Sequence, residues 1–399
     1  MHEPQNLKNK EIYPYMNKQP DKNIKHICIV ADNYPTEKDP TFPFVAQLAE
    51  AIVKSGINVT VIAPQNLLKY LLRGNQRHPK YRTKKIGNNN LTILQPCCIS
   101  FSNYTPKLNF ISRRKAIERS FEGLKNKPDV CYGHFWHSGY FIYDKAKKYN
   151  LPLFIATGES VINFKANNKN KKQFCEYVNG VICVSTKNKI ESTEKGLTTP
   201  EKCIVIPNAI DNNLFKKLDT KSCRSALDIQ EDDFAVAFVG WFSERKGSLR
   251  VSDAIEKLDN NNIKSIFIGS GTTEFEPRCK NIIFKGRVPH GEIPKYLNAA
   301  NVFVLPTLKE GCCNAVIEAM ACGLPIISSD LNFNYDVLDE TNSIMLDPND
   351  IDAISEAIDK LYNDRALARS LSDGALVKAE ELTLEQRVQK IIQFILSLT

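Results

Sequence analysis

The 399-residue sequence lacks any long apolar run. A helix that crosses a bilayer needs about 20 consecutive, mostly apolar residues, and no stretch here approaches that length. The first residues are rich in Lys, Asn and Pro, so they also lack the apolar centre of a secretory signal peptide. These absences exclude an integral membrane protein of the helical type and predict a cytoplasmic location.

The sequence is also poor in the short motifs that hold metals or build hydrolase sites. None of its twelve cysteines stands in Cys-x-x-Cys spacing, and neither His-Glu-x-x-His nor Gly-x-Ser-x-Gly occurs. Zinc hydrolases and serine hydrolases are therefore excluded by their usual signatures. Most cysteines lie in apolar, strand-like runs, as Cys28 and Cys183 do, which predicts buried free thiols in place of disulfides.

Length, composition and charge describe a globular protein with one unusual segment. Single cores stop growing near about 250–300 residues, so a chain of 399 predicts two domains. The net charge is +8, but residues 65–127 contain fourteen Lys or Arg and only two acidic residues, a local balance of +12 that leaves −4 for the rest. Charge concentrated in one segment indicates an anionic partner, although a solvated basic face remains an alternative.

The first half of the chain alternates between strand and helix patterns. Residues 1–22 have no apolar periodicity and predict a disordered leader. From Ile24 the run IKHICIVAD predicts a buried parallel strand, FPFVAQLAEAIVKSG a helix and NVTVIAP the next strand. The alternation continues to CIVIP. Residues 23–206 are therefore predicted to form an open parallel sheet with helices on both faces.

A second series of the same kind follows. FAVAFVGW, KSIFIGSG, NIIFKG, VFVLPT and PIISSD predict strands, and GSLRVSDAIEKLDN, HGEIPKYLNAA and NAVIEAMACG predict helices between them. Residues 207–382 therefore predict a second doubly wound domain. The amphipathic helix of residues 383–399 lies beyond this sheet and could pack back on the first domain. The predicted fold class is α/β, with two doubly wound, Rossmann-like domains.

Two carboxylates mark the most informative stretch, residues 302–330. Glu310 lies in the loop after a predicted strand, and Glu318 lies on the helix that follows. Ligands of open α/β sheets bind beyond the carboxyl ends of the strands, so both side chains are expected at a cleft. Gly311, Cys312, Cys313 and Asn314 form the start of this helix, where free N–H groups can bind an anion or a hydroxyl.

A second loop, FVGWFSERKGSLRV, leads from a strand into a helix through Gly240 and carries Lys246 at the helix start. A glycine turn, a cation and a helix N-terminus together make a diphosphate site. Arg245 is a possible second cation. A third segment, DVCYGHFWHSGYF, places His134 at the end of a strand, where a histidine is either a cleft residue or a satisfied core residue.

Taken together, these segments resemble the family-four (group 1) retaining glycosyltransferases. The resemblance implies the GT-B fold, α/β with two Rossmann-like domains facing across a cleft. The resemblance covers about residues 24–390 and is strongest in EGCCNAVIEAMACGLPII. It implies that Glu310 binds the hydroxyls of the donor sugar, that Glu318 binds the ribose and that His134 lies in the cleft. The stretch FKGRVPHGEIPKYL is similar to the family's base-reading segment, which implicates Arg287 and Val288. Trp241 stands where the family commonly has Arg.

The resemblance implies transfer of a sugar from a nucleotide-diphosphate sugar to a glycan or lipid-linked acceptor of the cell envelope, with retention and without a cofactor. A metal-independent reaction is expected, because the one Asp-x-Asp, Asp350 and Asp352, predicts a helix start. The basic segment 65–127 could hold the enzyme peripherally on an anionic membrane. A catalytically silent nucleotide-sugar-binding protein is the alternative, and no recognisable nucleic-acid-binding module is present.

Overall fold

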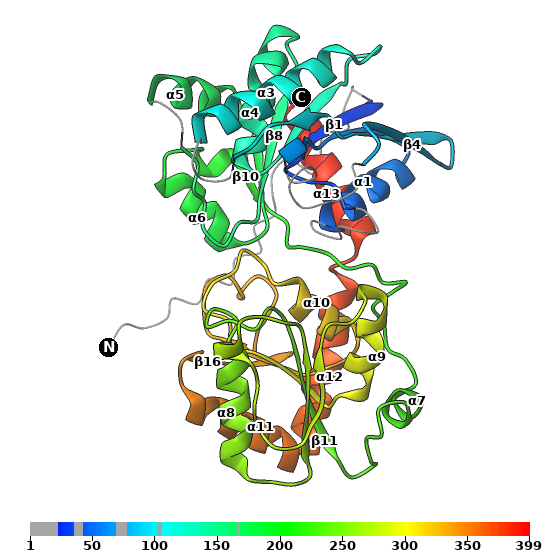
Figure 1. The fold of residues 1–399 in the computed structure, drawn as a ribbon, viewed down its shortest axis with the longest axis vertical. Helices are drawn as coiled ribbons and strands as arrows, with labels where there is room; N and C mark the ends of the chain where they lie inside the picture. Colours follow the sequence, from blue (N-terminus) through cyan, green and yellow to red (C-terminus); the bar gives the residue numbers. More distant parts are fainter. Residues whose placement is uncertain (1–22, 36–42, 69–77, 102–105, 166–167) are drawn as a thin grey trace.

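The computed structural model describes residues 23–35, 43–68, 78–101, 106–165 and 168–399. Its two main sheets each lie between helices, and they form two bodies stacked along the long axis of the molecule (Figure 1). This arrangement confirms the predicted pair of doubly wound α/β domains. The leader 1–22 and most of the Leu67–Leu72 run lie outside the described residues.

The first sheet has eight strands in the order β10-β9-β8-β7-β1-β2-β5-β4. Its parallel strands are β1 (His26–Val30), β2 (Asn58–Ile62), β5 (Asn89–Leu94), β7 (Val130–His134), β8 (Leu153–Thr157), β9 (Gly180–Cys183) and β10 (Cys203–Val205). β4 (Tyr81–Ile86) corrects the expectation of a wholly parallel sheet, because it pairs antiparallel with β5 through a turn at Gly87. Its polar residues gave no strand periodicity, and lysines on such an edge oppose pairing with other chains.

Alternate residues of the first sheet enter two separate cores. Ile27 and Ile29 of β1 face the cluster that contains α1 (Pro43–Lys54), whereas Cys28 and Val30 face the cluster formed with α3 (Pro106–Glu122), α4 (Trp136–Lys148) and α5 (Asn168–Tyr177). The period of two along a strand produces this division. Because both faces are covered, the strands read as continuous apolar runs in the sequence.

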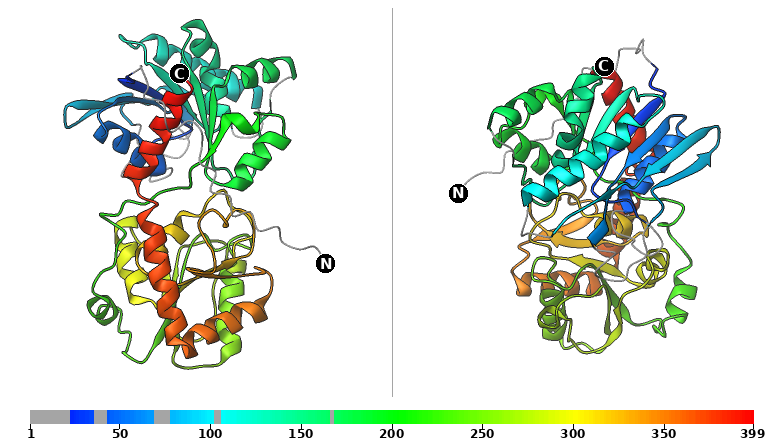
Figure 2. Two further views of the ribbon diagram at one scale, coloured as in Figure 1. Left: turned by 180° about the vertical axis from the view of Figure 1, so that it is seen from behind. Right: turned by 45° about the horizontal axis from the view of Figure 1, so that its top comes forward.

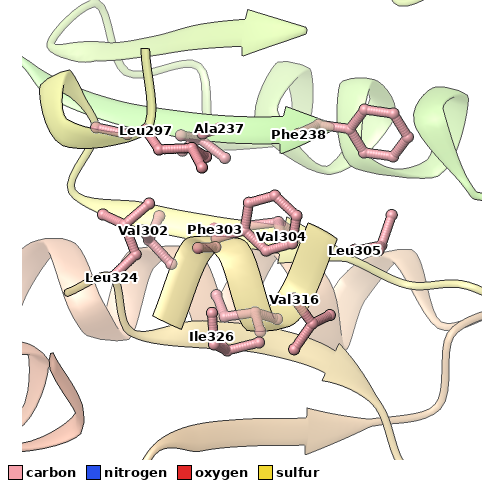
Figure 3. Close-up of a cluster of buried hydrophobic side chains, with 14 of the residues drawn as sticks. Ala237, Phe238, Leu297, Val302, Phe303, Val304, Leu305, Val316, Leu324 and Ile326 are labelled. Carbon is pink, nitrogen blue, oxygen red and sulfur yellow. The ribbon is translucent and has the colours of Figure 1, made fainter. Parts of the chain in front are cut away.

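The second sheet has six strands, all parallel, in the order β13-β12-β11-β14-β15-β16. They are β11 (Phe234–Val239), β12 (Ile263–Ile268), β13 (Ile282–Gly286), β14 (Val302–Leu305), β15 (Ile326–Ser329) and β16 (Ser343–Leu346). Figure 3 shows the apolar side chains of β11, β14 and β15 packed against Val316 of α10 (Asn314–Ala321). The other helices of this half are α7 (Thr220–Ser225), α8 (Ser248–Leu258), α9 (Ile293–Ala299), α11 (Ile351–Asn363) and α12 (Arg365–Glu380).

The chain passes between the two bodies twice. After β10 the segment around Ile206 leads to the second sheet, and after α12 the chain returns as α13 (Leu384–Ser397), which lies against the first body in both views of Figure 2. The apolar face of α13, with Ile391 and Phe394, is buried in the same core as α1. The two crossing segments bond to one another, because the Ile210 amide donates to the Leu382 carbonyl at 3.0 Å. No helix in the described ranges is both long and apolar enough to cross a bilayer.

Two smaller expectations can be compared with the structure directly. All twelve cysteines are free, and ten of them are buried, as predicted. Asp350 is the N-cap of α11 and accepts a hydrogen bond from the Ala353 amide, while Asp352 pairs with Lys257. The Asp-x-Asp therefore does start a helix. By contrast, β3 (Gln65–Asn66), β5, β6 (Cys97–Cys98), β16, α3, α5, α7 and α12 were not predicted, because their sequences are short or largely polar.

A pair of glycines sets the distance between β7 and α4, the two elements around His134. A Cβ added to Gly133 would lie 2.4 Å from the Gly139 Cα, and one added to Gly139 would lie 2.1 Å from the Ile155 Cδ1. The first contact is with main-chain atoms and cannot be relieved by a side-chain movement, whereas the second is with the end of a flexible side chain on β8. Gly133 is therefore the glycine that the close approach of α4 to β7 requires.

We predict that Gly133→Ala lowers the stability of the protein by about 1–3 kcal/mol, the usual cost of overpacking a close contact. Urea unfolding followed by circular dichroism would measure the shift in midpoint. Gly123→Ala is the matched control, because a Cβ there would lie 3.5 Å from its nearest neighbour and fits without movement. Equal midpoints for the two variants would contradict the proposed packing role of Gly133.

Candidate functional site

A cleft of about 460 Å³ lies where the carboxyl ends of the two sheets face one another. Its wall on the first body comes from residues that end β7, β8 and β9, and its wall on the second body comes from the loops after β11 and β14. The first turn of α13 closes one side. The predicted site residues that line this cleft are His134, Gly240, Lys246, Glu310, Cys312, Cys313, Asn314 and Glu318.

Lys246 and Glu310 form the central ion pair of this cleft. The Lys246 Nζ lies 2.8 Å from the Glu310 Oε1, and the side chains are only 13% and 14% exposed. Although burial disfavours a charged amine, the neighbouring Cys313 and Glu310 raise the pKa of Lys246, so it carries its charge at neutral pH. Arg245 also pairs with Glu310, from a more exposed position, and it does not line the cleft.

The loop after β11 is held close to the neighbouring strand end by glycines. A Cβ on Gly269 would lie 1.8 Å from the Gly240 carbonyl oxygen, so only glycine allows the two loops to meet. Gly247 adopts φ 77° as the N-cap of α8, which leaves the first amides of that helix directed out of its end. Trp241 lines the cleft with 55% of its surface exposed. The glycine turn, Lys246 and the start of α8 thus lie together as predicted from the sequence.

Glu318 projects from α10 into the same cleft. Its Oε1 lies 3.1 Å from the His290 Nε2, and this hydrogen bond raises the pKa of His290. Phe215 contacts the same imidazole edge to face at 5.1 Å. His290 was not selected from the sequence, because its partner Glu318 lies 28 residues further along the chain. The pair gives this end of the cleft a carboxylate acceptor and an imidazole that can both bind hydroxyl groups.

The start of α10 is joined to the crossing segment. The Asn208 Nδ2 donates to the Cys312 carbonyl at 3.1 Å and to the Asn314 Oδ1 at 2.8 Å. Gly311 does not line the cleft, because it packs against the first body, where an added Cβ would lie 2.1 Å from the Gly158 carbonyl oxygen. Gly311 thus lies at a contact between the two bodies, and its predicted role in donor binding stays a prediction.

His134 ends β7 and faces the cleft from the first body. Its ring stacks on Phe44 of α1 at 5.1 Å. Burial and then the charge of Arg387 lower the pKa of His134 to about 3, so the imidazole is neutral at physiological pH. The next residue, Phe135, has φ 82°, a strained conformation for a large side chain that is usually found at functional sites.

Arg387 on α13 is a cleft residue that sequence reasoning missed. Its Nη1 donates to the Ile206 carbonyl at 2.6 Å and also to the Pro207 carbonyl. Burial lowers the pKa of this guanidinium, but it still carries its charge because the ordinary value is very high. The helix that carries Arg387 belongs to none of the three predicted motifs. Arg387 therefore becomes a cleft residue only because the chain returns to the first body.

Two predicted donor-binding residues lie apart from the cleft lining. Arg287 and Val288 follow β13 at the edge of the second sheet, where Arg287 is exposed and Val288 packs on the core. Neither lines the cavity. Within the ranges that the structure describes, no group of three His, Cys, Asp or Glu side chains is arranged to hold a metal ion.

Comparison with known proteins gives two family matches, "Glycosyltransferase Family 4" over residues 43–214 and "Glycosyl transferases group 1" over residues 219–376. Among curated proteins, the proposed teichuronic acid biosynthesis glycosyltransferase TuaC of Bacillus subtilis (strain 168) is 25% identical over 367 residues, which cover 87% of this chain and 92% of TuaC. The Escherichia coli UDP-Gal:alpha-D-GlcNAc-diphosphoundecaprenol alpha-1,3-galactosyltransferase is 26% identical, over 65% of this chain and 73% of that protein.

Solved structures share the fold. Sucrose-phosphate synthase from Thermosynechococcus elongatus superposes with a TM-score of 0.74 at 18% identity, over 93% of this chain and 98% of that chain. Anabaena HepE in complex with UDP gives 0.70 at 15% identity, over 94% and 100% of the two chains. The two family matches follow the two sheets in order, and their site segments meet in one cleft. The chain therefore belongs to the group 1 glycosyltransferases of the GT-B fold.

Proposed function

We propose that this protein is a retaining, metal-independent glycosyltransferase that moves a sugar from a nucleotide-diphosphate sugar to a cell-envelope polysaccharide or a lipid-linked acceptor. The observation that carries the proposal is the buried Lys246–Glu310 pair beside the start of α8, facing His134 across the cleft. A cation and free amides suit a diphosphate, and a carboxylate beside them suits sugar hydroxyls. The relatives that carry out or are assigned to envelope glycan synthesis support this acceptor class.

In the proposed reaction the acceptor hydroxyl attacks the anomeric carbon from the face on which the diphosphate leaves. The bond from that carbon to the phosphate oxygen breaks, the new glycosidic bond forms, and the departing phosphate accepts the hydroxyl proton. Lys246 and the first amides of α8 stabilise the charge of the leaving diphosphate. Glu310 and the neutral imidazole of His134 orient the sugar, which retains its anomeric configuration.

The assigned roles divide the cleft into two ends. Glu310 contacts the donor sugar, and Glu318 with His290 contacts the ribose of the nucleotide. A catalytically silent nucleotide-sugar-binding protein is the second candidate, favoured by Trp241 in the phosphate loop. Release of free nucleotide in the presence of an acceptor would exclude it. A thermal-shift screen of nucleotide sugars would identify the donor, because a ligand of the folded state raises the melting temperature.

We also propose that the first body contacts an anionic membrane from the cytoplasmic side. Several basic residues of segment 65–127 are engaged within the protein, such as Arg114, which pairs with Glu118 and Asp144. The start of α3 and the segment before it present a different surface, here called the α3 patch. It consists of exposed apolar and basic side chains, namely Ile99, Phe101, Lys107, Leu108, Ile111, Lys115 and Arg119.

The α3 patch is held together by local hydrogen bonds. The Phe101 amide donates to the Asn109 Oδ1 and the Ile99 amide donates to the Ser112 Oγ, both at 2.8 Å, so the segment lies along the first turns of the helix. An apolar surface with a basic border suits the headgroup region, where each cation contributes about 1 kcal/mol.

Glu310→Gln is expected to lower turnover by roughly 10²-fold or more while nucleotide affinity is retained, since a group on the reacting sugar matters most in the transition state. Glu318→Ala should instead weaken nucleotide binding. Initial rates and calorimetric titration with the nucleoside diphosphate would measure both effects. Glu256→Gln, which alters an exposed ion-paired carboxylate on α8, is the control. The reverse pattern in the two variants would contradict the assigned roles.

Activity is expected to persist in excess EDTA, because Lys246 in the cleft provides the positive charge that a cation would otherwise supply. The measurement is nucleotide release before and after chelation, followed by addition of Mg²⁺ or Mn²⁺. Loss of activity that is restored by either ion would disprove metal independence.

The protein is expected to sediment with phosphatidylglycerol vesicles and not with phosphatidylcholine vesicles, and this binding should weaken with salt. Screening shortens the reach of charges from about 10 Å at 0.1 M to about 3 Å at 1 M. Phe101→Ser combined with Leu108→Ser should reduce binding, whereas Val377→Ser, which removes an exposed apolar residue from α12, should not. Equal sedimentation with both lipids would contradict the proposed binding to an anionic membrane.

A further inference from the structure

One charged side chain that lines the cleft has no partner of opposite charge among the described residues. Glu310 pairs with Lys246, and Glu318 pairs with His290. Arg387 is the remaining cation among the described lining residues, and no carboxylate in the described part of the chain forms a salt bridge with it. The cleft therefore contains one guanidinium whose charge has no protein counter-ion in the described residues.

The groups around Arg387 do not supply negative charge. Its Nη1 is held by the carbonyls of Ile206 and Pro207, which fix its position but leave its charge intact. The nearby His134 is neutral. Tyr132, two residues before His134 on β7, is fully buried in the core and does not line the cleft, so it supplies no charge there. The guanidinium charge is thus left without a negative partner among the described lining residues.

We propose that Arg387 binds a phosphate group of a substrate on the His134 side of the cleft, as a second cation in addition to Lys246. The inference rests on the proposed function in assuming that the cleft receives phosphorylated substrates. A desolvated cation without a counter-ion is costly, and a bound anion offsets that cost. A guanidinium has five donors in one plane and matches a phosphate better than it matches neutral hydroxyl groups.

The same phosphate chemistry has two sources in a glycosyltransferase cleft. One is the diphosphate of the nucleotide donor, and the other is a phosphate or diphosphate that carries the acceptor glycan. Arg387 belongs to α13, which packs on the first body with α1, and it lies beside His134 at the end of β7. Its position therefore allows either source, and separate titrations distinguish them.

The first experiment titrates inorganic pyrophosphate into the full-length wild type and into Arg387→Gln by calorimetry. We expect Arg387→Gln to bind pyrophosphate at least tenfold more weakly, as is usual when one partner of a charged hydrogen bond is removed. Arg224→Gln is the matched control. Arg224 is another buried arginine held by main-chain carbonyls, those of Ala299, Gln230 and Asp233, but it lies outside the cleft. Its variant should lose stability and keep pyrophosphate affinity within about twofold.

The second experiment separates the two sources. UDP, GDP and ADP are titrated alone, and pyrophosphate is then titrated with the tightest of them at saturation. Weaker nucleoside diphosphate binding by Arg387→Gln would assign Arg387 to the donor. If Arg387→Gln weakens only the binding of pyrophosphate to the nucleotide-saturated protein, Arg387 is assigned to an acceptor phosphate. Unchanged affinity in both titrations, or no pyrophosphate binding by the wild type, would overturn the inference.

Two further outcomes keep this inference separate from the proposed function. A wild type that binds pyrophosphate through Arg387 but binds no nucleoside diphosphate would contradict the proposed function and leave the inference standing. If Arg387→Gln does not fold, Arg387→Lys decides the question, because it keeps the charge and loses the planar set of donors. We expect Arg387→Lys to weaken pyrophosphate binding several-fold at an unchanged melting temperature, and wild-type affinity in this variant would overturn the inference.

Discussion

The ion pair between Lys246 and Glu310 is the interaction on which the candidate site depends. It joins the loops that follow β11 and β14, which are neighbouring strands of the second sheet. Both side chains are largely buried, so neither charge could remain there without the other. In the proposed function the leaving diphosphate contacts Lys246 and the reacting sugar contacts Glu310. The two members of one ion pair therefore bind the two groups between which the bond breaks.

Contacts between the two bodies determine which residues face that ion pair. Gly311 touches the Gly158 carbonyl, and the Thr186 amide and hydroxyl both donate to Asp336 at 2.6 Å. These contacts bring the ends of β7 and β8 opposite the loops of the second sheet. The cleft consequently combines a neutral imidazole on one wall with paired charges on the other, and Arg387 between the bodies adds an uncompensated positive charge.

Much of this architecture could be predicted from local pattern. Buried parallel strands are continuous apolar runs, and helix starts carry recognisable caps, as Asp350 does. Glu310 and Glu318 could be selected because any residue just beyond a parallel strand reaches the same edge of its sheet. The antiparallel β4 could not be predicted, because most of its residues are polar and exposed and form no apolar face. Arg287 and Val288 do not line the cleft in the structure, and their contact with the donor stays a prediction.

The sequence by itself determined the two doubly wound domains and the carboxylates and lysine of the second sheet, because strand periodicity and strand ends are properties of neighbouring residues. Only the tertiary structure decided that His290 would meet Glu318, that Phe44 would stack on His134 and that Arg387 would enter the cleft. Arg387 bonds to a carbonyl 181 residues earlier in the chain. Such contacts depend on how α13 packs across both bodies, and no local pattern of residues encodes that packing.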